Sequence, residues 1–153
     1  MQAMPRSEHQ SPDWQDQPPE QALQLAFVNV GRRLRAAFRT DPAAVGVLHT
    51  LACHGPMRVS GLADSLAIDI STTSRHVSGL ESDGFLTREP DPADRRASLV
   101  TLTPAGSDFL VRALEQRAGV LQAATGGWSA DDIDTLIRLL NRLADDLTEA
   151  PHP

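Results

Sequence analysis

Hydrogen-bonding side chains are concentrated in one short stretch of the sequence, residues 71–78. They are small hydroxyls, one guanidinium and one imidazole, on Ser71, Thr72, Ser74, Arg75, His76 and Ser78. Between them, Thr73, Val77 and Leu80 are spaced four and three residues apart, so a helix would bury these three and expose the polar set. Hydroxyls donate and accept hydrogen bonds, and arginine can bond guanine through two atoms. The pattern predicts a helix whose free face contacts base edges in the DNA major groove.

A second group of charged side chains lies in residues 90–96, which contain two prolines and two aspartates. This composition favours a turn or an extended loop. Because the loop separates two stretches typical of strands, 85–89 and 98–102, we expect a β-hairpin with Arg95 and Arg96 near its tip. Arginine there can enter a narrow minor groove, where the potential is most negative. We expect Asp94 to hold the guanidinium of one of these arginines.

A short helix over about 60–66 should precede the polar helix. Ser60 is its expected N-cap, and Leu62, Ala63 and Leu66 form an inward stripe. Arg58, just before this helix, is expected on the DNA-facing surface.

The polar helix itself should run from Ser71, as N-cap, to about residue 83, with Gly84 in the C′ position after its end. The linker 67–70 should insert Ile68 and Ile70 between the two helices as apolar anchors. The order of helix, turn, helix and hairpin predicts a winged helix-turn-helix.

Longer amphipathic helices are expected on both sides of this lobe. The first starts near residue 20, and the second starts at Asp41-Pro42 and ends at Gly55. After the hairpin, Thr103 should cap a helix that reaches about residue 124. Ser129 with Asp132 resembles a capping box that opens a last helix. The apolar stripe of that helix is Ile133, Leu136, Ile137, Leu140, Leu143 and Leu147.

On these residues the chain resembles the MarR family of dimeric transcription regulators. The resemblance is carried by GPMRVSGLADSLAID (55–69), STTSRHVSGLESDGFLTR (71–88), DPADRR (91–96) and LTPAG (102–106). The family's wing signature, Asp-Pro-x-Asp-Arg-Arg followed by Leu-Thr-x-x-Gly, stands here nearly unaltered. The resemblance covers roughly residues 20–149, and the helix and wing together are far more specific than a bare helix-turn-helix.

The resemblance implies a mostly α fold with a small hairpin wing. A disordered arm (1–19) would precede a single domain (20–149), with a winged lobe over 41–103 and dimerisation helices over 20–40 and 104–149. It also implies a homodimeric repressor on an inverted-repeat operator in double-stranded DNA, relieved by a small aromatic or phenolic ligand. The residues expected to border the ligand cavity are Phe38, His49 and Cys53.

Charge argues against a general nucleic-acid binder, because the net charge of the 153 residues is −6. Residues 55–105 hold five arginines against seven acidic residues. The placement of the arginines must therefore supply the attraction to phosphates.

Other chemistry has little support in the sequence. No phosphate loop, nucleophile elbow or metalloprotease motif is present, so we expect no enzyme and no cofactor. His49 and Cys53 are too few for a zinc site. A single cysteine and the lack of a long apolar run predict a cytoplasmic protein that stays off the membrane. We expect Cys53 to be buried and inert.

Two alternatives remain open. One is a thiol-based redox regulator, which shares the DNA chemistry but takes its input at Cys53. The other is a winged-helix module that binds protein instead of DNA, an interpretation favoured by the acidic balance. Salt-dependent binding to DNA separates the second alternative from the rest.

Overall fold

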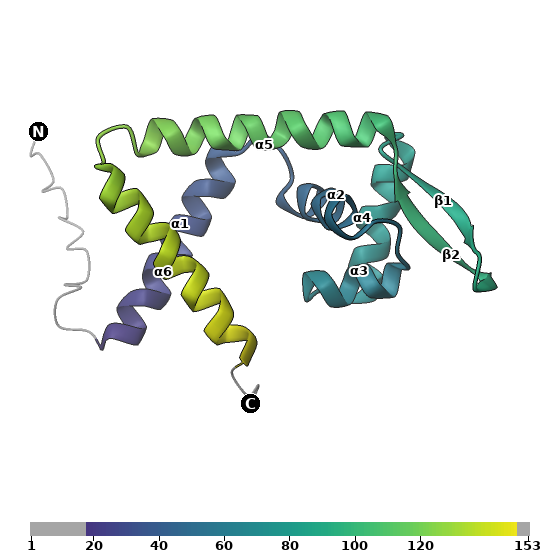
Figure 1. Cartoon of the computed structure of the whole chain (residues 1–153), viewed down its shortest axis with the longest axis horizontal. Coiled ribbons are helices and arrows are strands. Elements are labelled where there is room, and N and C mark those ends of the chain that lie inside the picture. Colours follow the sequence, from purple (N-terminus) through teal and green to yellow (C-terminus); the bar gives the residue numbers. More distant parts are fainter. Residues whose placement is uncertain (1–17, 150–153) are drawn as a thin grey trace, which may run out of the picture. The chain divides into compact units, whose positions relative to one another are not determined.

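The structure, a computed structural model, describes residues 18–149, apart from the side chains of Arg95 and Glu149. In this range it contains six helices and a two-stranded antiparallel hairpin (Figure 1), which confirms the predicted fold class. The expected arm over residues 1–19 falls almost wholly outside the described residues. The chain divides into two compact units, one ending at Arg39 and the other starting at Thr40.

The first unit is the helix α1 (Pro19–Ala37), which starts with proline in its first turn. Proline suits this position because the first helical N–H groups have no partner within the helix. No residue of α1 is buried, and Leu23, Phe27 and Val30 are each about half exposed. The amphipathic helix predicted from residue 20 is confirmed, and its apolar side is uncovered.

The second unit is built around a core of α2 (Pro42–His54), α3 (Val59–Leu66), α4 (Ile70–Ser82), the hairpin and the first half of the helix after it, through Leu110 and Ala113. Leu48, Leu62, Val77 and Val100 are its fully buried centre. The helix α2 starts at the predicted Asp41-Pro42, and Asp41 caps it by accepting a hydrogen bond from the backbone N–H of Ala43.

The two helices of the helix-turn-helix begin one residue earlier than predicted, so both predicted N-caps are wrong. Arg58, not Ser60, precedes α3, and no side chain caps that helix. Asp69, not Ser71, caps α4. The expected burial of Ile68 and Ile70 is also wrong, because both side chains are exposed. Ala67 makes the turn instead in a left-handed conformation, φ 52°.

The end of α4 is as predicted. Gly84 has φ 78°, a conformation that glycine adopts without strain. Its N–H donates to the carbonyl of Glu81, and the N–H of Phe85 donates to the carbonyl of Leu80. This is a Schellman motif, which satisfies the last carbonyls of the helix and turns the chain into the hairpin.

The hairpin consists of β1 (Leu86–Asp91) and β2 (Asp94–Leu102), with Leu86 opposite Leu102. Both strands reach further toward the tip than expected, and only residues 92–93 remain as the turn. The register shifts between Pro90 and Asp91, where proline cannot donate to the ladder. In Figure 1 the hairpin projects beyond α2, α3 and α4.

The helix α5 (Pro104–Ala124) starts where predicted, with the Thr103 hydroxyl accepting from the N–H of Gly106. The helix α6 (Ala130–Glu149) follows, and Ser129 and Asp132 exchange the hydrogen bonds of the predicted capping box. Much of the apolar stripe of α6 is exposed, at Leu136, Ile137, Leu140 and Leu147.

Candidate nucleic-acid interface

The polar face predicted for residues 71–78 lies on the outer side of α4. Thr73, Val77 and Leu80 are buried against the core, as their spacing predicted. The polar side chains are therefore outside: Ser71, Arg75 and Ser78 are exposed, and Thr72, Ser74 and His76 are partly buried. The structure thus brings the predicted α4 residues together on one face.

The first turn of α4 is organised by Asp69. One of its carboxylate oxygens, Oδ1, accepts hydrogen bonds from the Ser71 hydroxyl at 2.6 Å and from the backbone N–H of Thr72 at 2.8 Å. The hydrogen bond from the Ser71 hydroxyl, followed by those from Thr72, holds the pKa of Asp69 well below its ordinary value. The carboxylate is therefore charged at every pH near neutral, and it fixes the direction of the Ser71 hydroxyl.

Arg75 folds back along α4 toward the start of the helix. Its Nε donates to the carbonyl of Ser71 at 3.3 Å, and one Nη donates to the Thr72 hydroxyl at 3.1 Å. A guanidinium has five N–H donors, and these contacts use two. The side chain is thus pre-oriented on the exposed face while retaining donors for a ligand.

His76 is turned toward the protein. Its Nδ1 lies 3.8 Å from a carboxylate oxygen of Asp41, the cap of α2. This places His76 at the edge of the polar face, between α4 and the start of α2.

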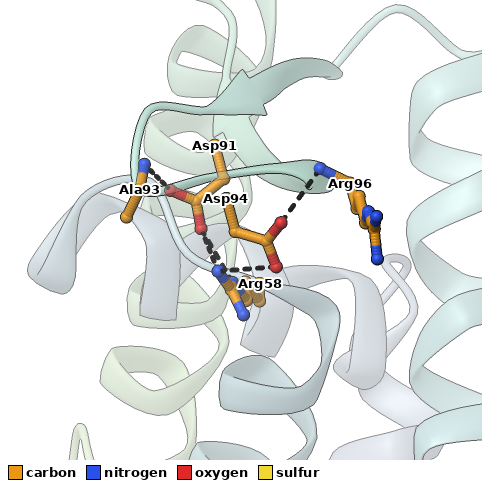
Figure 2. Close-up of polar contacts among 5 residues, drawn as sticks. All are labelled: Arg58, Asp91, Ala93, Asp94 and Arg96. Carbon is orange, nitrogen blue, oxygen red and sulfur yellow. Dashed lines mark hydrogen bonds and ion pairs between the residues drawn. The ribbon is translucent and has the colours of Figure 1, made fainter.

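Arg58 and Asp91 join the tip of the hairpin to the start of α3 (Figure 2). The Nε and one Nη of Arg58 lie 2.8 Å and 2.6 Å from Oδ2 of Asp91. The other oxygen of Asp91 accepts from the N–H of Ala93 in the turn at 2.8 Å. Asp91 is only 7% exposed, and the hydrogen bond from Ala93, followed by that from Arg58, holds its pKa below the ordinary value. We call this pair the wing clamp.

The expected contact of Asp94 with Arg95 falls on a side chain that is not described, but two other contacts of Asp94 are defined. Its Oδ1 accepts from the backbone N–H of Arg96 at 3.1 Å, and its Oδ2 lies 3.8 Å from Arg58. Figure 2 shows both carboxylates directed at Arg58. The Arg96 side chain is exposed, whereas that of Arg95 is not among those described.

A second ion pair joins the hairpin to α4. The Nε of Arg88, on β1, donates to both carboxylate oxygens of Glu81 at 2.9 and 3.0 Å. With the wing clamp, it ties both the middle of β1 and its end near the tip to the helices. The position of the hairpin relative to the polar face is therefore fixed by two charged contacts.

The residues expected at a ligand cavity lie in both units. His49 and Cys53 are exposed on α2, with Sγ of Cys53 3.7 Å from Nε2 of His49. The expectation that Cys53 is buried is therefore wrong. Phe38 belongs to the other unit, where it follows α1 as its C-cap. A hollow of about 400 Å³ lies elsewhere, lined by Gly127, Trp128, Asp132, Thr135, Leu136 and Leu139.

Two important carboxylates were missed from the sequence. Asp69 had a signal, because it stands directly before the polar helix and an aspartate there commonly accepts the N–H three residues on. Asp91 had none of this kind, since its partner Arg58 is 33 residues away along the chain. Neither periodicity nor turn composition predicts such a contact.

Comparison with known proteins gives one consistent result. The family model described as "MarR family" matches residues 42–98. The HTH-type transcriptional regulator YxaD of Bacillus subtilis is 36% identical over 58% of this chain and 62% of its own length. The multiple antibiotic resistance protein MarR of Salmonella typhimurium is 32% identical over 63% of this chain and 68% of its own length. The chain thus spans somewhat under two thirds of YxaD.

Solved structures share the fold. Bordetella bronchiseptica BpsR, whose DNA binding is described as regulated by 6-hydroxynicotinic acid, is 25% identical with a TM-score of 0.68. The match covers 80% of this chain and 98% of that one. Within residues 18–149, no helix combines the length and apolar character needed to cross a membrane.

Proposed function

Because this chain belongs to the MarR family of transcriptional regulators, we propose that its second unit binds double-stranded DNA in a sequence-specific way. In this proposal α4 enters the major groove and the hairpin contacts the neighbouring minor groove. The observation that carries it is the outer face of α4, where Ser71, Arg75 and Ser78 are exposed. The relatives are transcriptional regulators, and no enzymatic family is indicated.

The proposed contacts divide by chemistry. Arg75 bonds a guanine edge, and Ser71, Thr72, Ser74 and His76 contact other base edges or adjacent phosphates. Arg95 and Arg96 contact the minor groove. Arg58, which binds Asp91 at 2.6 Å, acts by holding the hairpin rather than by binding phosphate.

The functional form is a homodimer. The apolar stripes of α1 and α6 are exposed in the described chain, and burying such faces is the usual driving force for a permanent interface. Two copies of α4 related by a two-fold axis match an inverted repeat. Occupation of such an operator at a promoter gives a repressor.

The proposed signal is a small aromatic or phenolic ligand whose binding releases the protein from DNA, and the description of BpsR supports this. Phe38, His49 and Cys53 are the residues proposed to border its site. The ligand must bind the DNA-competent and incompetent forms with different affinity. A thiol-based input is the second candidate, because Cys53 is exposed beside His49.

Selection from a random duplex library tests the proposal. The full chain should enrich one inverted-repeat sequence after several rounds of capture. Recovery of unrelated sequences only, with no enrichment, would contradict sequence-specific binding. It would leave the acidic winged-helix module that binds protein as the better interpretation.

A further inference from the structure

Ile70 is an unexpected residue on the surface of α4. Its side chain is 57% exposed, and the neighbouring Ile68 is 36% exposed. A single exposed apolar residue needs no explanation on most surfaces. Ile70, however, is the first residue of the helix that we propose enters the major groove.

Ile70 lies one turn before Thr73, on the side of α4 that holds Thr73 and Val77, where the core has ended and its side chain is exposed. Side chains of an α-helix lean toward the N-terminus. At the first helical position this direction leads past the start of the helix, away from Thr73, which is the first buried residue of α4. In a helix-turn-helix, the residues at this end of the recognition helix are the ones that meet base edges. An apolar side chain there contacts the methyl group of thymine.

Ser71 beside it has a defined hydrogen-bonding polarity. Its hydroxyl lies 2.6 Å from Oδ1 of Asp69, and an ionised carboxylate can only accept. The hydroxyl proton is therefore committed to Asp69. The lone pairs of the Ser71 oxygen remain, so toward DNA this side chain is an acceptor. Together, Ile70 and Ser71 present an apolar surface next to a hydrogen-bond acceptor.

Only one type of base pair offers, in the major groove, both a methyl group for Ile70 and a hydrogen-bond donor for Ser71. An A·T pair carries the thymine 5-methyl group and the amino donor of adenine, whereas a G·C pair carries the cytosine amino donor without a methyl. We propose that Ile70 and Ser71 together read an A·T pair, with Ile70 packing on the thymine methyl and Ser71 accepting from the adenine amino group. This inference rests on the proposed function, since it requires α4 to enter the groove.

Base analogues test each contact separately, on the duplex that the wild-type chain selects. Deoxyuridine in place of thymine removes only the methyl group. At one thymine per half-site it should weaken wild-type binding about 4-fold for each half-site, or roughly 15-fold for the duplex, the loss expected for one buried CH₂-sized group at each. Ile70→Ala should bind the thymine duplex weaker by a similar factor and should no longer distinguish thymine from deoxyuridine.

The amino contact is tested in the same pair. Purine deoxyriboside in place of adenine removes the amino group, and it should weaken binding by the wild type but not by Ser71→Ala. Replacing the A·T pair by G·C, so that cytosine takes the place of thymine, should also weaken wild-type binding. 5-Methylcytosine in that place should restore part of it because the methyl returns. Ile68→Ala, at the neighbouring exposed isoleucine, is the matched control and should keep both sensitivities.

The outcomes separate the two claims. If the chain selects no sequence, the proposed function itself fails. If it selects one but tolerates deoxyuridine at every thymine, or if Ile70→Ala keeps the wild-type sensitivity, the inference is overturned while DNA binding stands. Retention of the purine effect in Ser71→Ala overturns it as well. Thermal unfolding of each variant checks that the exposed substitutions leave the fold intact.

Discussion

A carboxylate near DNA normally weakens binding, because it repels phosphates. Asp91 is placed for the opposite effect, since it bonds Arg58 on one side and the turn of the hairpin on the other. Its pKa lies below the ordinary 3.8, so its stabilising effect is full above that pH. The effect is lost only as the pH falls through the lower folded-state value. The wing clamp therefore stays closed throughout the neutral range.

The variant Asp91→Asn should bind the selected duplex several-fold more weakly than the wild type, although it removes a negative charge. The slope of binding against salt should stay the same, because no phosphate contact is lost. Glu89→Gln, at an exposed carboxylate on the same strand, is the matched control and should bind equally or slightly tighter. Tighter binding by Asp91→Asn, measured by fluorescence anisotropy, would show that the clamp has no role.

Arg75 should contribute specificity as well as affinity. Arg75→Ala should cost about 1–3 kcal/mol in binding and relax the preference at one position of the operator. Arg112→Ala, at an exposed arginine on α5, removes the same charge away from the proposed interface and should leave the preference unchanged. Competition between duplexes altered at single positions measures both. An unchanged preference in Arg75→Ala would remove this residue from base recognition.

At the scale of elements, the junction between the hairpin and α5 depends on one glycine. A Cβ on Gly106 would overlap the backbone carbonyl oxygen of Phe85 and press on Leu102. Nothing lies near the Cβ position of Gly119, further along the same helix. Close packing thus explains the glycine of the LTPAG motif, whereas helix formation would favour alanine at both positions.

Gly106→Ala should therefore lower the free energy of unfolding by roughly 1–3 kcal/mol, since the backbone must shift to make room. Gly119→Ala should raise it by up to about 1 kcal/mol, because alanine is the better helix former. Chemical denaturation of both variants measures the difference. Equal effects of the two substitutions would mean that the close approach at Gly106 is relieved without cost.

The elements were largely predictable, because each helix and strand carries its own periodicity and end signals. The helix stripe on Thr73, Val77 and Leu80 and the glycine at 84 are local patterns that need no tertiary information. Both N-caps were missed by two residues, and at α4 the reason is that several neighbouring residues can accept the same N–H groups. Asp69, as an acceptor carboxylate, is used in place of the serine hydroxyl.

The site was less predictable, because its contacts join distant residues. Arg58 was assigned to the DNA-facing surface, yet its guanidinium is bound to Asp91 across 33 positions. Cys53 was expected inside because its helix is apolar. It lies two residues after the buried Leu51, which places it about 200° further round the helix, away from the core. Ile70 was expected inside because it is an apolar residue in the linker between the two helices.

At the scale of the whole molecule, the proposed homodimer would bury the exposed stripe of α6. Leu140→Asp should give a monomer and abolish tight binding to an inverted repeat, because a charge in a core-like interface is costly. Thr135→Asp adds the same charge on the opposite side of the helix, where no stripe residue is three or four positions away, and should remain dimeric. Analytical ultracentrifugation compares the two. A dimeric Leu140→Asp would place the interface elsewhere.

In the proposed function, the winged unit distinguishes one DNA sequence from others by contacts of α4 and the hairpin. The most direct test is the affinity of the full chain for its selected duplex and for a scrambled duplex, each measured over a series of salt concentrations. We expect both affinities to fall as salt rises, with the selected duplex bound at least about 10³-fold more tightly near physiological salt. Equal affinities for the two duplexes, or no binding to either, would contradict the account.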